Sequence, residues 1–280
     1  MKNVVSLLCC IFVLGAQVHA QKEKISVDDL ISRHAAAIGT SEAREAARSL
    51  VLMGQGTVSS KIGYIGCIGG PAQFASVANN FLFAMVLNSN EYPYERLAFN
   101  GKDLSFGRPA GSSLTKLGEF VKSQSSIAKQ GLLGGALSTN WALARADKTK
   151  IKMEYAGIDT LGGGKYHKLK LRVRGTGELR VSAYFEPDTF RHKITVYEYS
   201  VAAYFTSAVR TENSSAQASH FSLTEQFSDF KQVGSLTLPM TYSITISSQD
   251  QGQTESLTWN IEFKQAYFNE PLEASAFKVS

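Results

Sequence analysis

The sequence predicts an α+β protein that is mainly antiparallel β, a half-open curled β-barrel of about 9–11 strands with an N-terminal helix and an inserted helical plug or lid. First, apolar and polar residues alternate with a period of two through most of the chain after Leu50, as in strands with one buried face. Second, helices do not regularly follow strands, as a parallel sheet would require. Third, residues 113–145 interrupt the alternation. So many strands must curl or close.

Residues 1–20 are predicted to be a secretory signal peptide. They hold a lysine near the start, an apolar run that ends at Leu14, and small residues before the expected cleavage point, the three parts of such a peptide. The apolar run is too short to span a membrane. We expect cleavage after Ala20, and a mature chain of residues 21–280 that is one domain, monomeric and peripheral to the membrane at most.

Composition narrows the function classes. Cys9 and Cys10 leave with the signal peptide, so Cys67 is the remaining cysteine; no internal disulfide can form, and a hydrophobic core must stabilise the chain. The formal net charge of +5 is mild, and the basic residues are spread along the predicted strands. Because a nucleic-acid surface needs a basic patch, no nucleic-acid partner is expected.

Helices are predicted before the first strand, either two short ones or one broken at Gly39. Ser26 is a typical N-cap, with Asp29 three residues on. Gly39 supplies a C-terminal stop, and Thr40 or Ser41 can begin a second helix.

The strand pattern then runs to the end of the chain. Asn100-Gly101 predicts a hairpin turn, glycines 162–164 predict another, and Pro187-Asp188 a third. Residues 59–73 are rich in glycine and are predicted to be a long hairpin loop. The strand-patterned stretches are 50–60, 75–89, 95–107, 150–158, 166–174, 178–200, 220–231, 238–248 and 255–266.

If the sheet curls, its apolar face lines a concave cavity. The residues predicted to line this cavity are Phe83, Met85, Met153, Leu169, Leu171, Phe185, Ile194, Val196, Ile244, Trp259 and Ile261. Burying such side chains contributes about 1.5–3 kcal/mol each, so the face must be covered.

The stretch GLLGGALSTNWALA, residues 131–144, is the predicted cover. Leu132, Leu133, Leu137 and Trp141 form its plug, and Gly131, Gly134 and Gly135 its hinges. Two interpretations stay open: a permanently filled core, or a lid that an acyl chain replaces.

Catalytic signatures are missing from the sequence. The mature histidines (His34, His167, His192 and His220) have no metal-ligand spacing, and they are expected to be surface or half-buried. No G-x-S-x-G motif occurs, and Cys67 has no local partner, so we expect a buried or idle thiol there. The sequence predicts no enzyme, metal or cofactor.

An enzyme acting on envelope lipid or glycan would need carboxylates that face the cavity. Alternation directs Glu154, Glu186 and Glu198 outward. Glu225 shares the phase of Phe221, Leu223 and Phe227 and is the expected inward acid, as a polar group at the barrel mouth.

Several stretches resemble the outer-membrane lipoprotein-sorting (LolA/LolB) superfamily. They are DDLISRHAAAIG, GQGTV, FSDFKQVGSLTLPMTYSI and the ending WNIEFKQAYFNEPLEASAFKV. The stretches LGEFVKSQSSIAKQGLLGGALSTNWALA and YFEPDTFRHKITVYEYSV are similar to a bacterial branch of that superfamily.

The resemblance implies a half-open antiparallel barrel with helices in its mouth, located in the periplasm and binding lipid or lipoprotein acyl chains without a cofactor. It also implies an alternative, an envelope-stress sensor of the same fold with an envelope protein partner. In the carriers an arginine holds the lid shut, and Arg96 is the candidate here because it lies in an early strand.

Overall fold

The structure is a computed structural model that describes residues 25–61, 66–145, 150–201, 219–250 and 253–279. The predicted signal peptide lies outside these ranges and stays a prediction. Within the ranges, no helix has both the length and the apolar character needed to cross a membrane.

Two helices precede the sheet, which decides between the two predicted arrangements. α1 (Val27–Ile38) begins after Ser26, whose side chain accepts a hydrogen bond from the backbone N–H three residues on. α1 ends at Ile38, directly before Gly39, and α2 (Ser41–Ala46) begins after Thr40, whose hydroxyl accepts a similar bond. Each N-cap satisfies an N–H that has no partner within the helix.

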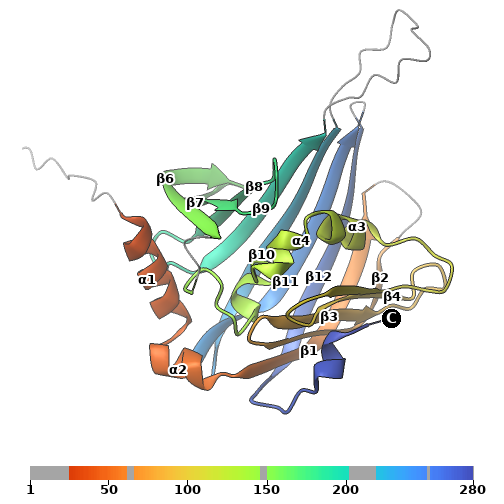
Figure 1. Cartoon of the computed structure of the whole chain (residues 1–280), viewed down its shortest axis with the longest axis horizontal. Coiled ribbons are helices and arrows are strands. Elements are labelled where there is room, and N and C mark those ends of the chain that lie inside the picture. Colours follow the sequence, from red (N-terminus) through yellow and green to blue (C-terminus); the bar gives the residue numbers. More distant parts are fainter. Residues whose placement is uncertain (1–24, 62–65, 146–149, 202–218, 251–252, 280) are drawn as a thin grey trace, which may run out of the picture.

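The described residues form one antiparallel sheet of twelve strands (Figure 1). The order across it is β5-β4-β3-β2-β1-β12-β11-β10-β9-β8-β7-β6, so pairing of β1 with β12 joins two arms, and β5 and β6 are the edges. The strands are β1 (Ser49–Ser60), β2 (Ile68–Val77), β3 (Asn80–Val86), β4 (Tyr94–Phe99), β5 (Leu104–Gly107), β6 (Ile151–Leu161), β7 (Gly164–Val173), β8 (Arg180–Phe185), β9 (His192–Val201), β10 (Ser219–Val233), β11 (Leu236–Asp250) and β12 (Gln253–Phe268).

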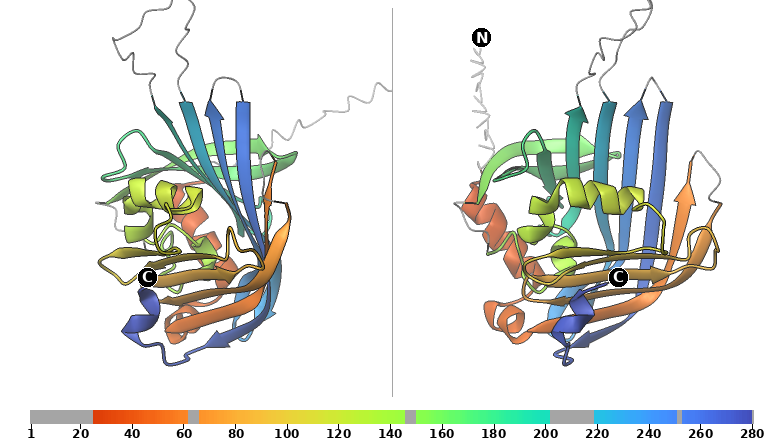
Figure 2. Two further views of the ribbon diagram at one scale, coloured as in Figure 1. Left: turned by 90° about the vertical axis from the view of Figure 1, so that its right-hand side faces the viewer. Right: turned by 45° about the vertical axis from the view of Figure 1, so that its right-hand side comes forward.

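The sheet is curled and unclosed, which confirms the predicted fold class. Its concave side holds the segment between β5 and β6 (Figure 2). We call residues 113–145 the plug. It contains α3 (Lys116–Ser123), α4 (Ser125–Lys129) and the 3-10 turn η1 (Gly135–Leu137). A second 3-10 turn, η2 (Ala274–Phe277), follows the last strand.

The number of strands and one loop differ from the prediction. Residues 68–73 belong to β2, although their glycines predicted a loop. A Cβ on Gly70 would lie 2.0 Å from the Val86 carbonyl oxygen, so this glycine permits a close approach between strands. The stretch 75–89 contains a turn at Ala78, where φ is +49°, and therefore supplies parts of two strands.

Candidate functional site

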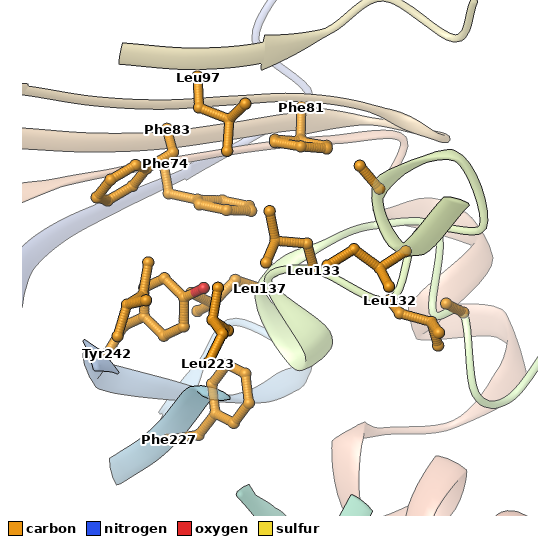
Figure 3. Packing of buried hydrophobic residues seen from close by; sticks show 14 of the residues in the cluster. Phe74, Phe81, Phe83, Leu97, Leu132, Leu133, Leu137, Leu223, Phe227 and Tyr242 are labelled. Carbon is orange, nitrogen blue, oxygen red and sulfur yellow. The ribbon is translucent and has the colours of Figure 1, made fainter. Parts of the chain in front are cut away.

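The leucines of the plug lie between two apolar walls of the curled sheet (Figure 3). The first wall comes from β2, β3 and β4, and the second from β10 and β11. Leu132, Leu133 and Leu137 are at most 4% exposed. The labelled wall residues are Phe74, Phe81, Phe83 and Leu97 on one side and Leu223, Phe227 and Tyr242 on the other.

Most of the predicted cavity residues lie in this core. Met153 is half-buried and packs against it. The predicted residues that are fully buried in the core, each at most 3% exposed, are Phe83, Met85, Leu169, Leu171, Phe185, Ile244, Trp259 and Ile261.

Ile194 and Val196 do not line the cavity as predicted, because they lie on the opposite face of β9. They alternate with Thr195 and Tyr197, and the Tyr197 hydroxyl lies 2.8 Å from the Glu225 carboxylate inside the barrel. Successive side chains of a strand point to opposite faces. Both phases of β9 carry apolar or aromatic residues, so the sequence alone did not fix which phase faces inward.

The closed interior leaves little space. A cavity of about 20 Å³ remains between the plug and the sheet, lined among others by His34, Leu132, Trp141 and Tyr197. That volume suits a water molecule. An acyl chain can therefore occupy this interior only if plug side chains leave it.

Glu225, the predicted inward acid, is 0% exposed and binds the plug backbone. The Gly134 N–H donates to its Oε1 at 2.7 Å, the Tyr197 hydroxyl donates to its Oε2 at 2.8 Å, and the Tyr242 hydroxyl donates to Oε1. Burial raises the pKa of Glu225 to about 7, against the lowering effect of these bonds.

Glu95 is a second buried acid, and the sequence reasoning missed it. The Thr115 hydroxyl, at the N-terminus of α3, donates to its Oε1 at 2.9 Å, and the Tyr92 hydroxyl donates to Oε2. Burial raises the pKa of Glu95 to about 7. Its phase, shared with Leu97 and Phe99 on β4, was the signal that could have found it.

Further polar contacts hold the C-terminal part of the plug. The Ser76 hydroxyl accepts from the Thr139 N–H at 3.0 Å, and the Trp141 indole N–H donates to the Arg44 carbonyl oxygen at 3.2 Å. A Cβ on Gly134 would lie 2.5 Å from the Phe74 ring, so glycine is required there by packing as well as by its φ of +84°.

The predicted glycine hinges all have positive φ. Gly131 is at +69°, Gly134 at +84° and Gly135 at +46°. Trp141 shares this left-handed region with a φ of +47°, which costs a non-glycine residue about 1–2 kcal/mol. These values describe the closed arrangement, and a hinge motion stays a prediction.

Three histidines are buried, contrary to the expected surface or half-buried placement. His34 on α1 and His192 on β9 have ring centroids 5.9 Å apart. Burial lowers the pKa of His34 to about 4 and that of His192 to about 3, so both are neutral at pH 7. His167 is also buried, and burial is the main cause of its lowered pKa.

Arg96 does not hold the plug. It alternates with Glu95 and Leu97, and its guanidinium stacks over the Tyr94 ring at 4.6 Å. Cys67 is exposed and free, not buried. Across the described ranges, no three His, Cys, Asp or Glu side chains form a group that could hold a metal ion.

A groove of about 440 Å³ opens beside the start of α3. Tyr92 and Thr115, which bind Glu95, belong to its lining, and so do Tyr94, Leu114 and Leu257. The Tyr92 hydroxyl also accepts from the Trp259 indole N–H at 3.1 Å. The Glu95 contacts therefore lie between this groove and the buried core.

No protein-family model matches the sequence, and no curated protein does so either. Among solved structures, the chain is similar to a LolA superfamily protein from Nitrosomonas europaea, with 15% identity, a TM-score of 0.46, and coverage of 91% of this chain and 98% of that one. For a domain named for outer membrane lipoprotein sorting, from Vibrio parahaemolyticus, the values are 10%, 0.48, 90% and 97%. For a DUF1329 family protein from Desulfovibrio piger they are 7%, 0.45, 90% and 95%.

The architecture is an open, curled antiparallel sheet with a helical plug on its concave side. This is the arrangement that the sequence resemblance implied. At identities of 7–15%, the ligand has to be argued from the residues of this chain themselves.

Proposed function

We propose that this protein is a carrier that binds the acyl chains of lipids or lipoproteins in the periplasm, in the space that the plug fills in the closed form. One observation supports this most: a separate segment supplies the apolar filling of the curled sheet. Of residues 131–143, all but Gly135 and Asn140 are buried.

The burial free energies of the four predicted plug side chains and of one acyl chain are similar. Leu132, Leu133, Leu137 and Trp141 contribute about 6–12 kcal/mol by burial, at about 1.5–3 kcal/mol each. An acyl chain of about 14 methylene groups offers about 11 kcal/mol, at about 0.8 kcal/mol for each group. Exchange of these four side chains for one acyl chain is therefore close to balanced, which a carrier that loads and unloads requires.

The polar contacts of the plug with the sheet are individual hydrogen bonds, which water can replace. Its backbone and hydroxyl groups at Thr115, Gly134 and Thr139 bind side chains of the sheet through hydrogen bonds. Water replaces such bonds when the plug leaves, so each is worth about 0.5–1.5 kcal/mol net, more where the acceptor is charged. The plug is not joined to the sheet by a strand ladder.

The test locks the plug in place. Ser76 Oγ and Thr139 Oγ1 lie 3.4 Å apart, so S76C/T139C in a Cys67→Ser background places two thiols in contact. We expect the reduced protein to bind a brominated fatty acid, which quenches Trp259 fluorescence once Trp141→Phe removes the other tryptophan. The oxidised protein, with the disulfide formed, should bind none.

The reduced form of the same variant is the matched control. Equal quenching in both forms would mean that the chain does not replace the plug. No binding in either form, together with no lipid extracted from the protein purified without detergent, would mean that the plug is permanent core.

A further inference from the structure

The hydroxyl of Tyr197 has two acceptors and one proton. It lies 2.8 Å from Glu225 Oε2 and 3.2 Å from the carbonyl oxygen of Leu132 in the plug. A hydroxyl donates one hydrogen bond at a time. Which acceptor receives it therefore depends on whether Glu225 can itself donate.

The two protonation states of Glu225 hold the plug differently. Protonated Glu225 can donate to the Tyr197 oxygen, which frees the Tyr197 hydroxyl to donate to Leu132. Ionised Glu225 is an acceptor without a proton, so the Tyr197 hydroxyl turns to it and the Leu132 carbonyl loses its donor. The protonated state thus adds a second bond between sheet and plug, beside the bond from Gly134.

We propose that Glu225 is a positioning residue that holds the plug closed while it carries a proton and favours release of the plug when it loses that proton. The acyl exchange that this controls rests on the proposed function, whereas the plug movement itself does not. Loading of an acyl chain is then easier at higher pH.

The direction of the pKa shift of Glu225 agrees with this proposal. Burial raises the pKa of Glu225 from 4.5 to about 7 in the closed form, and a carboxyl exposed by plug release regains its ordinary value. Between these values, opening the plug releases one proton. The opening equilibrium constant therefore rises up to about tenfold per pH unit across that window and levels off above it.

The groups around Glu225 do not reverse this direction. Tyr197 and Tyr242 stay neutral because burial raises their pKa values. His192 faces Gly135, and His34 lies beside it; burial keeps both neutral above about pH 4. Within the described residues, what acts on the Glu225 carboxyl is burial and its three hydrogen bonds.

Glu95 titrates in the same range near the start of the plug, with a pKa raised to about 7 by burial. Arg96 stacks on Tyr94 on the outer face, and Lys116 pairs with Glu255. Glu95 therefore adds its own proton release on opening, and it has to be substituted separately.

Hydrogen exchange of residues 131–144 in the whole protein, without lipid, measures plug opening directly. After correction for the intrinsic exchange rate, we expect protection to fall by up to about tenfold per pH unit more in the unchanged protein than in Glu225→Gln between pH 5 and 7. Adding Glu95→Gln to Glu225→Gln should remove the pH slope that remains in that variant. Glu262→Gln, exposed on β12, is the control and should keep the full slope.

Tyr197→Phe tests the same inference if Glu225→Gln folds poorly. It keeps the carboxyl and removes the bond to Leu132, so plug protection at pH 5 should fall toward the value of the unchanged protein at pH 8. An unaltered pH slope in Glu225→Gln, or unaltered protection at pH 5 in Tyr197→Phe, would overturn the role of Glu225.

Uptake of a brominated fatty acid, measured at the same pH values, separates the two proposals. A plug that opens with pH in a protein that binds no lipid contradicts the carrier and leaves the role of Glu225 intact. Lipid uptake at a rate independent of pH contradicts the role of Glu225 alone.

Discussion

Strands β10–β12 and the plug bury comparable apolar faces, yet they are held in different ways. The strands are 15, 15 and 16 residues long and pair along almost their whole length. The plug has helices of 8 and 5 residues, and between them and β6 its chain makes turns with positive φ. The backbone ladder stabilises the strands locally, whereas contacts with the sheet stabilise the plug.

The difference teaches that burial does not measure how firmly a segment is held. Trp141 in the plug is 2% exposed and Trp259 in β12 is 0% exposed. Each indole N–H has one acceptor, the Arg44 carbonyl and the Tyr92 hydroxyl respectively. The two tryptophans are about equally buried. We nevertheless expect the loss of Trp259 to destabilise the sheet and the loss of Trp141 to destabilise only the plug.

The tryptophan pair gives the largest expected effect. Trp259→Ala should lower the global free energy of unfolding by about 3–5 kcal/mol, seen as lost hydrogen-exchange protection across β11 and β12. Trp141→Ala should lose a similar amount confined to residues 116–144, because the plug can open without the sheet. Equal loss of protection across the sheet in both variants would show that sheet and plug open as one unit.

The buried histidines give the next largest effect, a loss of stability as the pH falls. Their pKa values are lowered to about 4 and about 3 in the folded state, so they contribute stability above pH 6.5 that is lost as the pH falls. By pH 4 this linkage amounts to about 3 kcal/mol for each histidine. Glu95 and Glu225 oppose it, because their raised pKa values stabilise the folded state as the pH falls from about 7.

Because these effects oppose each other, the quantity to measure is the difference in stability loss between a histidine variant and the unchanged protein. His192→Gln should lose less stability than the unchanged protein between pH 6.5 and pH 4 in urea unfolding. Replacing His220, which is 44% exposed at its side chain, should leave the profile unchanged. Parallel profiles for the unchanged protein and His192→Gln would contradict a neutral buried imidazole.

Gly134 and Gly157 separate packing from backbone strain. Their φ values are +84° and +88°, but a Cβ meets the Phe74 ring at 2.5 Å on Gly134 and meets nothing within 4 Å on Gly157. Gly157→Ala should cost about 1–2 kcal/mol from the left-handed backbone, and Gly134→Ala about 1 kcal/mol or more beyond that from overpacking. Equal costs in thermal unfolding would mean that the plug shifts freely beside Phe74.

The smallest effect compares two N-caps. Thr40 caps α2 outside the barrel, and Thr115 caps α3 while its hydroxyl also donates to Glu95. Thr40→Ala should cost about 1 kcal/mol, and Thr115→Ala about 1 kcal/mol more, because Glu95 stays buried with one donor fewer. A double-mutant cycle of Thr115→Ala with Glu95→Gln would give a coupling near zero if that bond contributes nothing.

The sequence predicted most of the sheet because alternation, hairpin turns and caps are local signals. The Asn100-Gly101 turn, the Ser26 cap and the inward phase of Glu225 are all seen in the structure. Prediction was weaker where both phases of a strand are apolar, as at Ile194 and Val196, and where glycine reports a close approach of strands, as at Gly70.

The sequence by itself determined that this chain forms a curled antiparallel sheet with an apolar face and an uncharged segment to cover it. Tertiary structure alone decided that Glu95 binds Thr115 near the start of the plug, that Glu225 binds Gly134 further along it, and that His34 and His192 meet inside. The physical reason is the separation, along the chain, of the residues that make each contact. Periodicity acts between neighbours in the chain, whereas these contacts join residues far apart in it, and only folding sets their distances and their pKa values.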